Sequence, residues 1–169
     1  AFLMMSMMFI MIPRAIVSIN RVVEVLQTKS SITDPRHPSC PDKVRGVVEY
    51  RNVSFHYPGG DGDVLSDISF TALPGQITAF IGATGSGKST LVNLLPRFYD
   101  VTGGEILIDG VNIKDWPLHK LRQSLGFVPQ KGILFSGTIR SNLAYGDRTA
   151  SGEQIERSAR IAQAMEFIE

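Results

Sequence analysis

The stretch that decides the fold is Gly82-Ala83-Thr84-Gly85-Ser86-Gly87-Lys88-Ser89-Thr90. It matches G-x-x-x-x-G-K-[ST], the pattern of a phosphate-binding loop. The apolar run 77–81 before it predicts a buried strand, and the run 91–95 after it predicts a helix. Because strand, glycine-rich loop and helix form the context in which this pattern binds phosphate, the sequence predicts an α/β phosphate-loop NTPase rather than a chance glycine-rich turn.

The residue types of the loop have a direct chemical reason. Glycines let the backbone bend so that successive N–H groups face phosphate oxygens. The N-terminus of the following helix adds a partial positive charge at the same point. Lys88 is expected to reach the β- and γ-phosphates, and the Ser89 hydroxyl is expected to bind Mg²⁺.

The composition is that of an ordinary globular protein, with 43% hydrophobic and 20% charged residues among 169. A net charge of +1 gives no electrostatic case for nucleic acid as a partner. The single cysteine, Cys40, excludes an internal disulfide.

The N-terminal residues 1–12 are apolar apart from Ser6. Twelve helical residues span only ~18 Å, against ~30 Å for the hydrocarbon core of a bilayer, so this segment cannot cross a membrane alone. We expect it to be the end of a transmembrane helix in contact with lipid. The basic residues Arg14, Arg21 and Lys29 follow it, as is typical of the cytoplasmic side. A buried core helix stays open as the alternative.

The remaining pattern suggests three parts along the chain. Apolar residues at helical spacing predict that the first helix continues to Gln27 or Thr28, so residues 1–28 form the helix and its cytoplasmic extension. Residues 29–45 are expected to be a linker, and 46–169 a second domain. The expected elements of that domain are strands at 47–55, 64–70 and 125–128, a strand and hairpin turn at 105–110, and a helix opened by a capping box at Ser151.

Several spaced motifs now coincide. Val53-Ser54-Phe55-His56-Tyr57-Pro58 precedes the glycine-rich loop, and Gly126-Phe127-Val128-Pro129-Gln130 follows it. Between and after them come the runs 94–100, 103–110 and 134–143. In this order the motifs resemble the nucleotide-binding domain of an ATP-binding-cassette (ABC) transporter of the exporter type. Residues 1–28 resemble the end of the transmembrane helix that precedes that domain.

The resemblance implies ATP and Mg²⁺ as cofactors, and roles for particular residues. Tyr57 would stack on adenine, and Thr90 would contact the α-phosphate. Gln130 would bridge Mg²⁺ and the attacking water, so that Gln130 and Lys88 are the catalytic candidates and Ser89 and Gln130 the metal ligands. The other expected nucleotide-binding residues are Gly82, Thr84, Gly85, Ser86 and Gly87. The alternatives are a half-buried strand aromatic for Tyr57 and an ordinary loop amide for Gln130.

Three motifs of the family do not occur in this sequence: the signature Leu-Ser-Gly-Gly-Gln, the apolar strand ending in Asp-Glu, and the downstream switch histidine. We therefore expect residues 46–169 to be the truncated first part of the domain, unstable and inactive by itself. In the intact protein the resemblance implies a membrane location with this domain on the cytoplasmic side. The implied partners are its own transmembrane domain and a second half-transporter, identical or different.

Two other functions fit parts of the sequence. A nucleotide-binding but non-hydrolysing half of a heterodimeric exporter stays open, because the carboxylate that would decide it is not in this sequence. A soluble phosphate-loop kinase or GTPase is disfavoured by the contexts of Tyr57 and Gln130, and a GTPase also by the absence of Asn-Lys-x-Asp.

Overall fold

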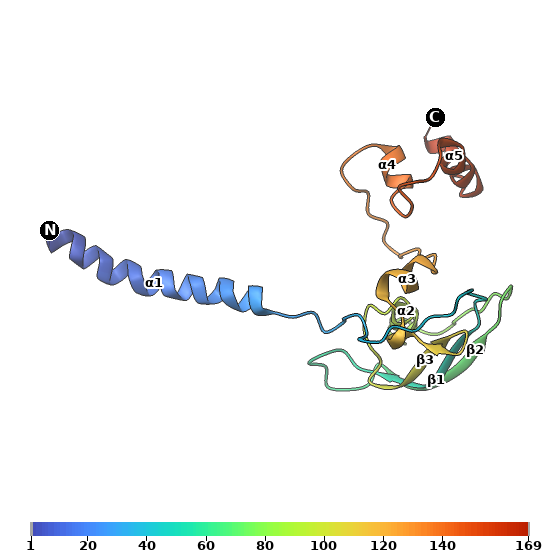
Figure 1. Cartoon of the computed structure of the whole chain (residues 1–169), viewed down its shortest axis with the longest axis horizontal. Coiled ribbons are helices and arrows are strands. Elements are labelled where there is room, and N and C mark those ends of the chain that lie inside the picture. The colour runs from blue at the N-terminus through green and yellow to red at the C-terminus, as the bar shows by residue number, and fades with distance from the viewer. Residues whose placement is uncertain (1, 169) are drawn as a thin grey trace. The chain divides into compact units, whose positions relative to one another are not determined.

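The computed structural model describes residues 2–168, so Ala1 and Glu169 lie outside the described residues. The chain divides into two compact units on either side of the bond between Gly126 and Phe127. The elements of the first unit are α1 (Phe2–Gln27), β1 (Val48–Phe55), β2 (Leu65–Ala72), α2 (Lys88–Leu94), β3 (Gly103–Ile108), β4 (Val111–Asn112), η1 (Ile113–Asp115) and α3 (Leu118–Gln123). Those of the second unit are α4 (Ile139–Leu143), α5 (Gly152–Ile161) and η2 (Met165–Phe167) (Figure 1).

The first helix runs through Pro13 and ends at Gln27, as its apolar spacing predicted. Most of its described apolar side chains are exposed, among them Phe9, Val25 and Leu26. No helix in the described part of the chain is both long and apolar enough to cross a membrane. The assignment of residues 1–28 to the end of a transmembrane helix therefore stays a prediction.

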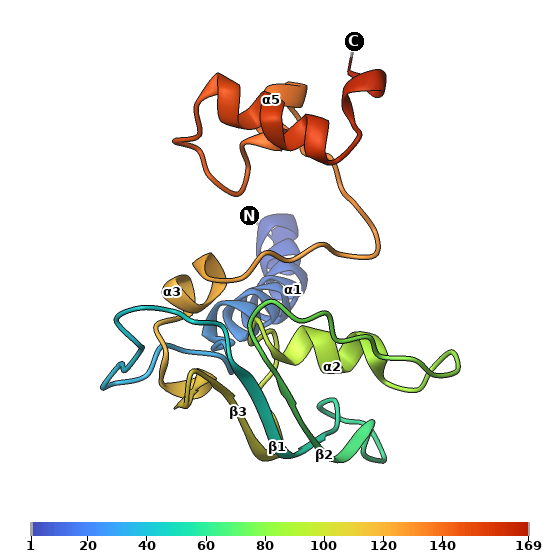
Figure 2. The same ribbon diagram turned by 90° about the vertical axis from the view of Figure 1, so that its right-hand side faces the viewer.

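The first unit is built on a four-stranded antiparallel sheet in the order β2-β1-β3-β4 (Figure 2). Tyr50 of β1 lies opposite Phe70 on one side and Ile106 on the other. The strands expected near 47–55, 64–70 and 105–108, and the hairpin at Asp109-Gly110, are confirmed.

The helix α2 lies against this sheet. The buried Tyr50 hydroxyl donates to the Leu91 carbonyl at 3.0 Å, and Leu91 and Leu94 join the strand residues in one hydrophobic core. Burial raises the pKa of Tyr50, because the phenolate would lie out of water. Trp116 and Leu121 extend the same core toward η1 and α3. The start of α2, which carries the glycine-rich loop, is thus held by a packed sheet.

Two expected strands are wrong. Residues 77–81 and 125–128 are irregular, and Ile77 and Ile81 are 98% and 95% exposed. A buried strand forms only when neighbouring strands accept and donate its backbone hydrogen bonds. Neither run has such a neighbour in the described part of the chain, so the apolar pattern alone does not produce a strand here.

The second unit contains two capped helices. Thr138 and Ser151 open α4 and α5, each with a complete capping box, and the box at Ser151 was predicted. The Asn142 side chain bonds the N–H and carbonyl of Phe135, at 2.7 and 3.0 Å, and thereby closes the loop before α4. Phe135 and Tyr145 stack with ring centroids 4.3 Å apart.

Asp109, in the turn between β3 and β4, holds the segment that leads into β1. Its carboxylate accepts backbone N–H groups from Arg45, Gly46 and Val47 at 2.7 to 3.2 Å. Desolvation would raise the pKa of Asp109, but these N–H groups outweigh it and hold the pKa below its ordinary value. The charged form is therefore the one that stabilises the fold.

We expect Asp109→Asn to destabilise the domain by about 1 kcal/mol at neutral pH, since each bond to a charged acceptor is worth more than a neutral one. Asparagine tolerates the left-handed backbone of this position (φ 52°), so strain is not introduced. Because the native pKa is lowered, the stabilisation is present above the unfolded-state value of ~3.9 and is lost as the pH falls below it. Urea unfolding of both proteins at pH 7 and pH 3 measures this. A difference between them that is independent of pH would contradict the prediction.

Candidate nucleotide-binding site

The glycine-rich loop turns sharply at Gly85 and Gly87, where φ is 83° and 85°. A Cβ on Gly87 would lie 2.8 Å from Leu65 Cδ2 and 3.1 Å from the Val64 carbonyl oxygen, so the loop can approach β2 only with glycine here. A Cβ on Gly85 would meet nothing within 4 Å. The loop is thus packed against β2 at Gly87 and open at Gly85.

The N-terminus of α2 has no internal counter-charge. Gly87 is its N-cap, no side chain caps it, and its first turn holds no acidic residue. The first N–H groups of a helix lack intrahelical partners and carry the positive end of its dipole. A phosphate group fits this donor set, because it supplies both the missing acceptors and the negative charge.

Lys88 lies folded over the loop that it follows. Its Nζ donates to the carbonyls of Gly82 and Ala83 at 2.8 and 2.7 Å, and to Ser86 Oγ at 3.3 Å. These bonds keep the ammonium group beside the loop. Anionic phosphate oxygens are stronger acceptors than carbonyls, so a triphosphate can draw the ammonium away from them.

Ser89 and Thr90 differ in exposure. Ser89 is exposed, which leaves its hydroxyl accessible to a hydrated cation. Thr90 is 7% exposed, and its hydroxyl lies 3.0 Å from the Tyr57 hydroxyl. The structure therefore brings Tyr57, two residues after β1, to the first turn of α2, although Thr90 lies 33 positions further along the chain.

Tyr57 belongs to an aromatic cluster that the sequence analysis did not identify as a unit. Its ring makes edge-on contacts with Phe55 and Tyr99, with centroids 4.9 and 5.1 Å away. Tyr99 lies five residues beyond the end of α2, in the run 94–100. A second aromatic residue shortly after the loop helix is the signal that could have identified it. These contacts fix the orientation of the Tyr57 ring.

Gln130 lies in the second unit and is exposed. Its role as a ligand of Mg²⁺ and of the attacking water stays a prediction.

Comparison with known proteins supplies the family. A model of the ABC transporter family, described as "ABC transporter", matches residues 65–169, which is more than half of the chain. The chain belongs to the ABC transporter family, and its fold is that of an ABC nucleotide-binding domain.

The similar proteins include a flippase and an exporter. An ABC transporter ATP-binding protein of Mycobacterium tuberculosis is 44% identical over all of this chain and 30% of its own length. The ATP-dependent lipid A-core flippase of Pseudomonas aeruginosa is 51% identical over 76% of this chain and 21% of its own length. A solved bacterial Atm1-family ABC exporter with ATP bound has a TM-score of 0.85 and 36% identity, over 98% of this chain and 29% of that one. The chain thus spans less than a third of the length of these relatives.

Proposed function

We propose that this chain is the ATP-binding part of an exporter, in which ATP binding and hydrolysis drive the movement of a solute or lipid across a membrane. The observation that carries the proposal is the loop 82–90, with its uncapped helix start and Lys88 held beside it. The ATP bound in the similar Atm1-family structure supports the choice of nucleotide. The flippases and exporters among the relatives support the direction of transport.

Different residues contact different parts of the nucleotide. Backbone N–H groups of Gly85 to Thr90 hold the phosphates, and Lys88 neutralises part of their charge. Ser89 and Gln130 would hold Mg²⁺, which would neutralise further negative charge of the triphosphate. Tyr57 offers its ring to adenine, a contact that needs no hydrogen-bond pattern. Gln130 orients the water that attacks the terminal phosphate.

The wider assembly is part of the same proposal. Residues 1–28 end a transmembrane helix whose residues 1–12 meet lipid, 29–45 link it to the domain, and 46–169 lie on the cytoplasmic side. A second half-transporter completes the ATP site.

A nucleotide titration of the full-length protein tests the proposal. Fluorescent trinitrophenyl-ATP should bind saturably in the presence of Mg²⁺ and be displaced by MgATP. Magnesium pyrophosphate should displace it more weakly, since it lacks the base that Tyr57 contacts. Absence of saturable binding would refute the proposed function.

Substitutions of Tyr57 distinguish the contribution of its ring to ATP affinity from that of its hydroxyl group. We expect Tyr57→Ala to weaken ATP binding by roughly 5- to 150-fold, because base stacking on an aromatic is worth about 1–3 kcal/mol. Tyr57→Phe keeps the ring and loses only the bond to Thr90, so its affinity should stay within about threefold. Isothermal titration with MgATP measures both. Equal losses in the two variants would show that the ring does not stack on the base.

A further inference from the structure

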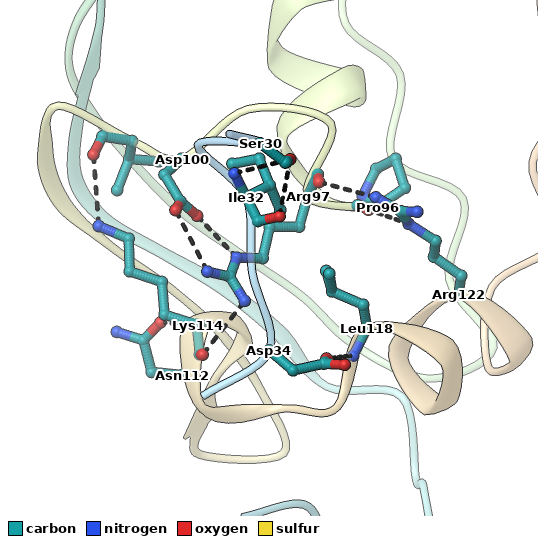
Figure 3. A network of polar contacts seen from close by, with 11 residues as sticks. Ser30, Ile32, Asp34, Pro96, Arg97, Asp100, Asn112, Lys114, Leu118 and Arg122 are labelled. Atoms are coloured by element: carbon teal, nitrogen blue, oxygen red, sulfur yellow. Dashed lines mark hydrogen bonds and ion pairs between the residues drawn. The ribbon is translucent and has the colours of Figure 1, made fainter. Parts of the chain in front are cut away.

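The segment between α1 and β1 lies against the first unit instead of running free. Asp34 Oδ1 accepts the backbone N–H of Leu118 at 2.7 Å (Figure 3). The Ser39 N–H donates to the Asp115 carbonyl at 2.8 Å. Cys40 is half-buried against the hydrophobic core. We name residues 30–40 the strap. The strap contacts α3 through Asp34, η1 through Ser39 and the hydrophobic core through Cys40.

Asp34 supplies the N-terminal cap that α3 lacks in its own sequence. The N-cap residue of α3 is Pro117, which makes no side-chain cap. A carboxylate at this position satisfies an otherwise unpaired N–H group and offsets the helix dipole. A helix of six residues gains little from its own hydrogen bonds, so an external cap matters to it.

The other end of α3 is bonded to the end of α2. Arg122 donates from Nε to the Pro96 carbonyl and from Nη2 to the Arg97 carbonyl, both at 3.1 Å. Its guanidinium lies 5.6 Å from the centre of the Phe98 ring. A cation that binds carbonyls just beyond a helix C-terminus is favoured by the helix dipole. Figure 3 shows Arg122 reaching back to this turn from α3.

An ion pair between the buried Arg97 and the half-buried Asp100 stiffens the same turn. The Arg97 side chain, with the residue only 6% exposed, binds both carboxylate oxygens of Asp100, at 2.7 and 3.2 Å. Its Nη1 also donates to the Lys114 carbonyl in η1 at 3.3 Å. Because loss of Asp100 would leave the charge of the buried Arg97 uncompensated, this turn resists local change. The end of α2, η1 and α3 therefore behave as one block, to which the strap is bonded.

We propose that the strap, through the Asp34 cap on α3 and the Arg122 bonds to the end of α2, couples the position of the N-terminal segment to occupancy of the nucleotide site. The nucleotide acts on the start of α2 and the strap on the block at its end. A seven-residue helix is only ~10 Å long and moves as a rigid body, so a shift at one end reaches the other. The coupling rests on the proposed function, whereas docking of the strap does not. Coupling between two sites is reciprocal. If bound nucleotide favours docking of the strap, then docking of the strap must raise the affinity for nucleotide by the same factor.

Trypsin cleavage after Arg36 in the full-length protein tests docking, because Arg36 lies between the two bonded positions Asp34 and Ser39. Without nucleotide, Asp34→Ala should speed cleavage of the Arg36–His37 bond about fivefold, as expected for a lost helix cap. Asp34→Asn keeps an acceptor oxygen and should recover most of the protection. The matched control is Asp42→Ala, an exposed acid of the same segment, which should cleave at the wild-type rate. Equal cleavage rates for Asp34→Ala and Asp42→Ala would show that Asp34 does not hold the strap against the first unit.

Adding MgATP tests the coupling. Saturating MgATP should slow cleavage after Arg36 at least threefold in the wild type but leave Lys88→Ala unchanged. Arg122→Ala should bind trinitrophenyl-ATP and yet lose this protection, while the milder Arg122→Lys, which keeps the charge, retains part of it. If nucleotide binds and cleavage of the wild type stays the same, the coupling is refuted. If no nucleotide binds at all, the proposed function and the coupling fail together, and the comparison of Asp34→Ala with Asp42→Ala still decides whether the strap docks.

Discussion

Replacing Lys88 by alanine is expected to lower the affinity for MgATP by roughly 10- to 100-fold. Each hydrogen bond from a charged donor contributes about 1.5–3 kcal/mol, and each 1.4 kcal/mol is a factor of ten in affinity. The fold should be unaffected, because the Lys88 ammonium bonds only oxygens of its own loop, at Gly82, Ala83 and Ser86. Isothermal titration of the full-length protein with MgATP gives the affinity, and circular dichroism checks the fold.

Two further variants test whether the loss of affinity is specific to the Lys88 side chain. Lys88→Arg keeps the charge but is longer and planar, so it should recover only part of the affinity. Lys43→Ala removes an exposed lysine of the segment before β1 and should bind MgATP as the wild type does. Equal loss of affinity in Lys43→Ala and Lys88→Ala would mean that only the overall charge matters. Wild-type affinity in Lys88→Ala would remove Lys88 from the site.

Gly104→Ala is expected to destabilise the domain by about 3 kcal/mol or more. Gly104 has φ 69°, and a Cβ there would collide with the carbonyl oxygens of Arg51 and Asn52 in β1. Both the left-handed backbone and the overpacking cost free energy, and the two add. The neighbouring backbone cannot give way easily, because β1 is an inner strand of the sheet, between β2 and β3.

Gly110→Ala is the matched control. Gly110 has φ 80°, but a Cβ there would meet nothing within 4 Å, so only the strain of the left-handed backbone remains, about 1–2 kcal/mol. Hydrogen exchange of the β1 and β3 amides in the full-length protein measures both effects. Equal loss of protection in the two variants would show that the close approach of Gly104 to β1 is not what requires glycine.

The sequence by itself determined the features that depend on neighbours along the chain. The glycine-rich loop and α2, the hairpin at Asp109-Gly110 and the cap at Ser151 all follow from residues a few positions apart. The order of the motifs was specific enough to give the family, which the comparisons confirm. The predictions that failed, at 77–81 and 125–128, concern strands whose formation depends on residues elsewhere, and no local pattern can supply those.

Only the tertiary structure decided which distant residues share a site. It brought Tyr57 to Thr90 and added Tyr99 beside them. It also placed Asp34 on α3, 84 residues further along the chain, where the composition had suggested only an extended linker. Such contacts are set by how the sheet, α2 and α3 pack around one core, so a pattern along the chain does not specify which distant residues meet. A capping carboxylate is recognisable from sequence when it precedes its own helix, and not when another segment provides it.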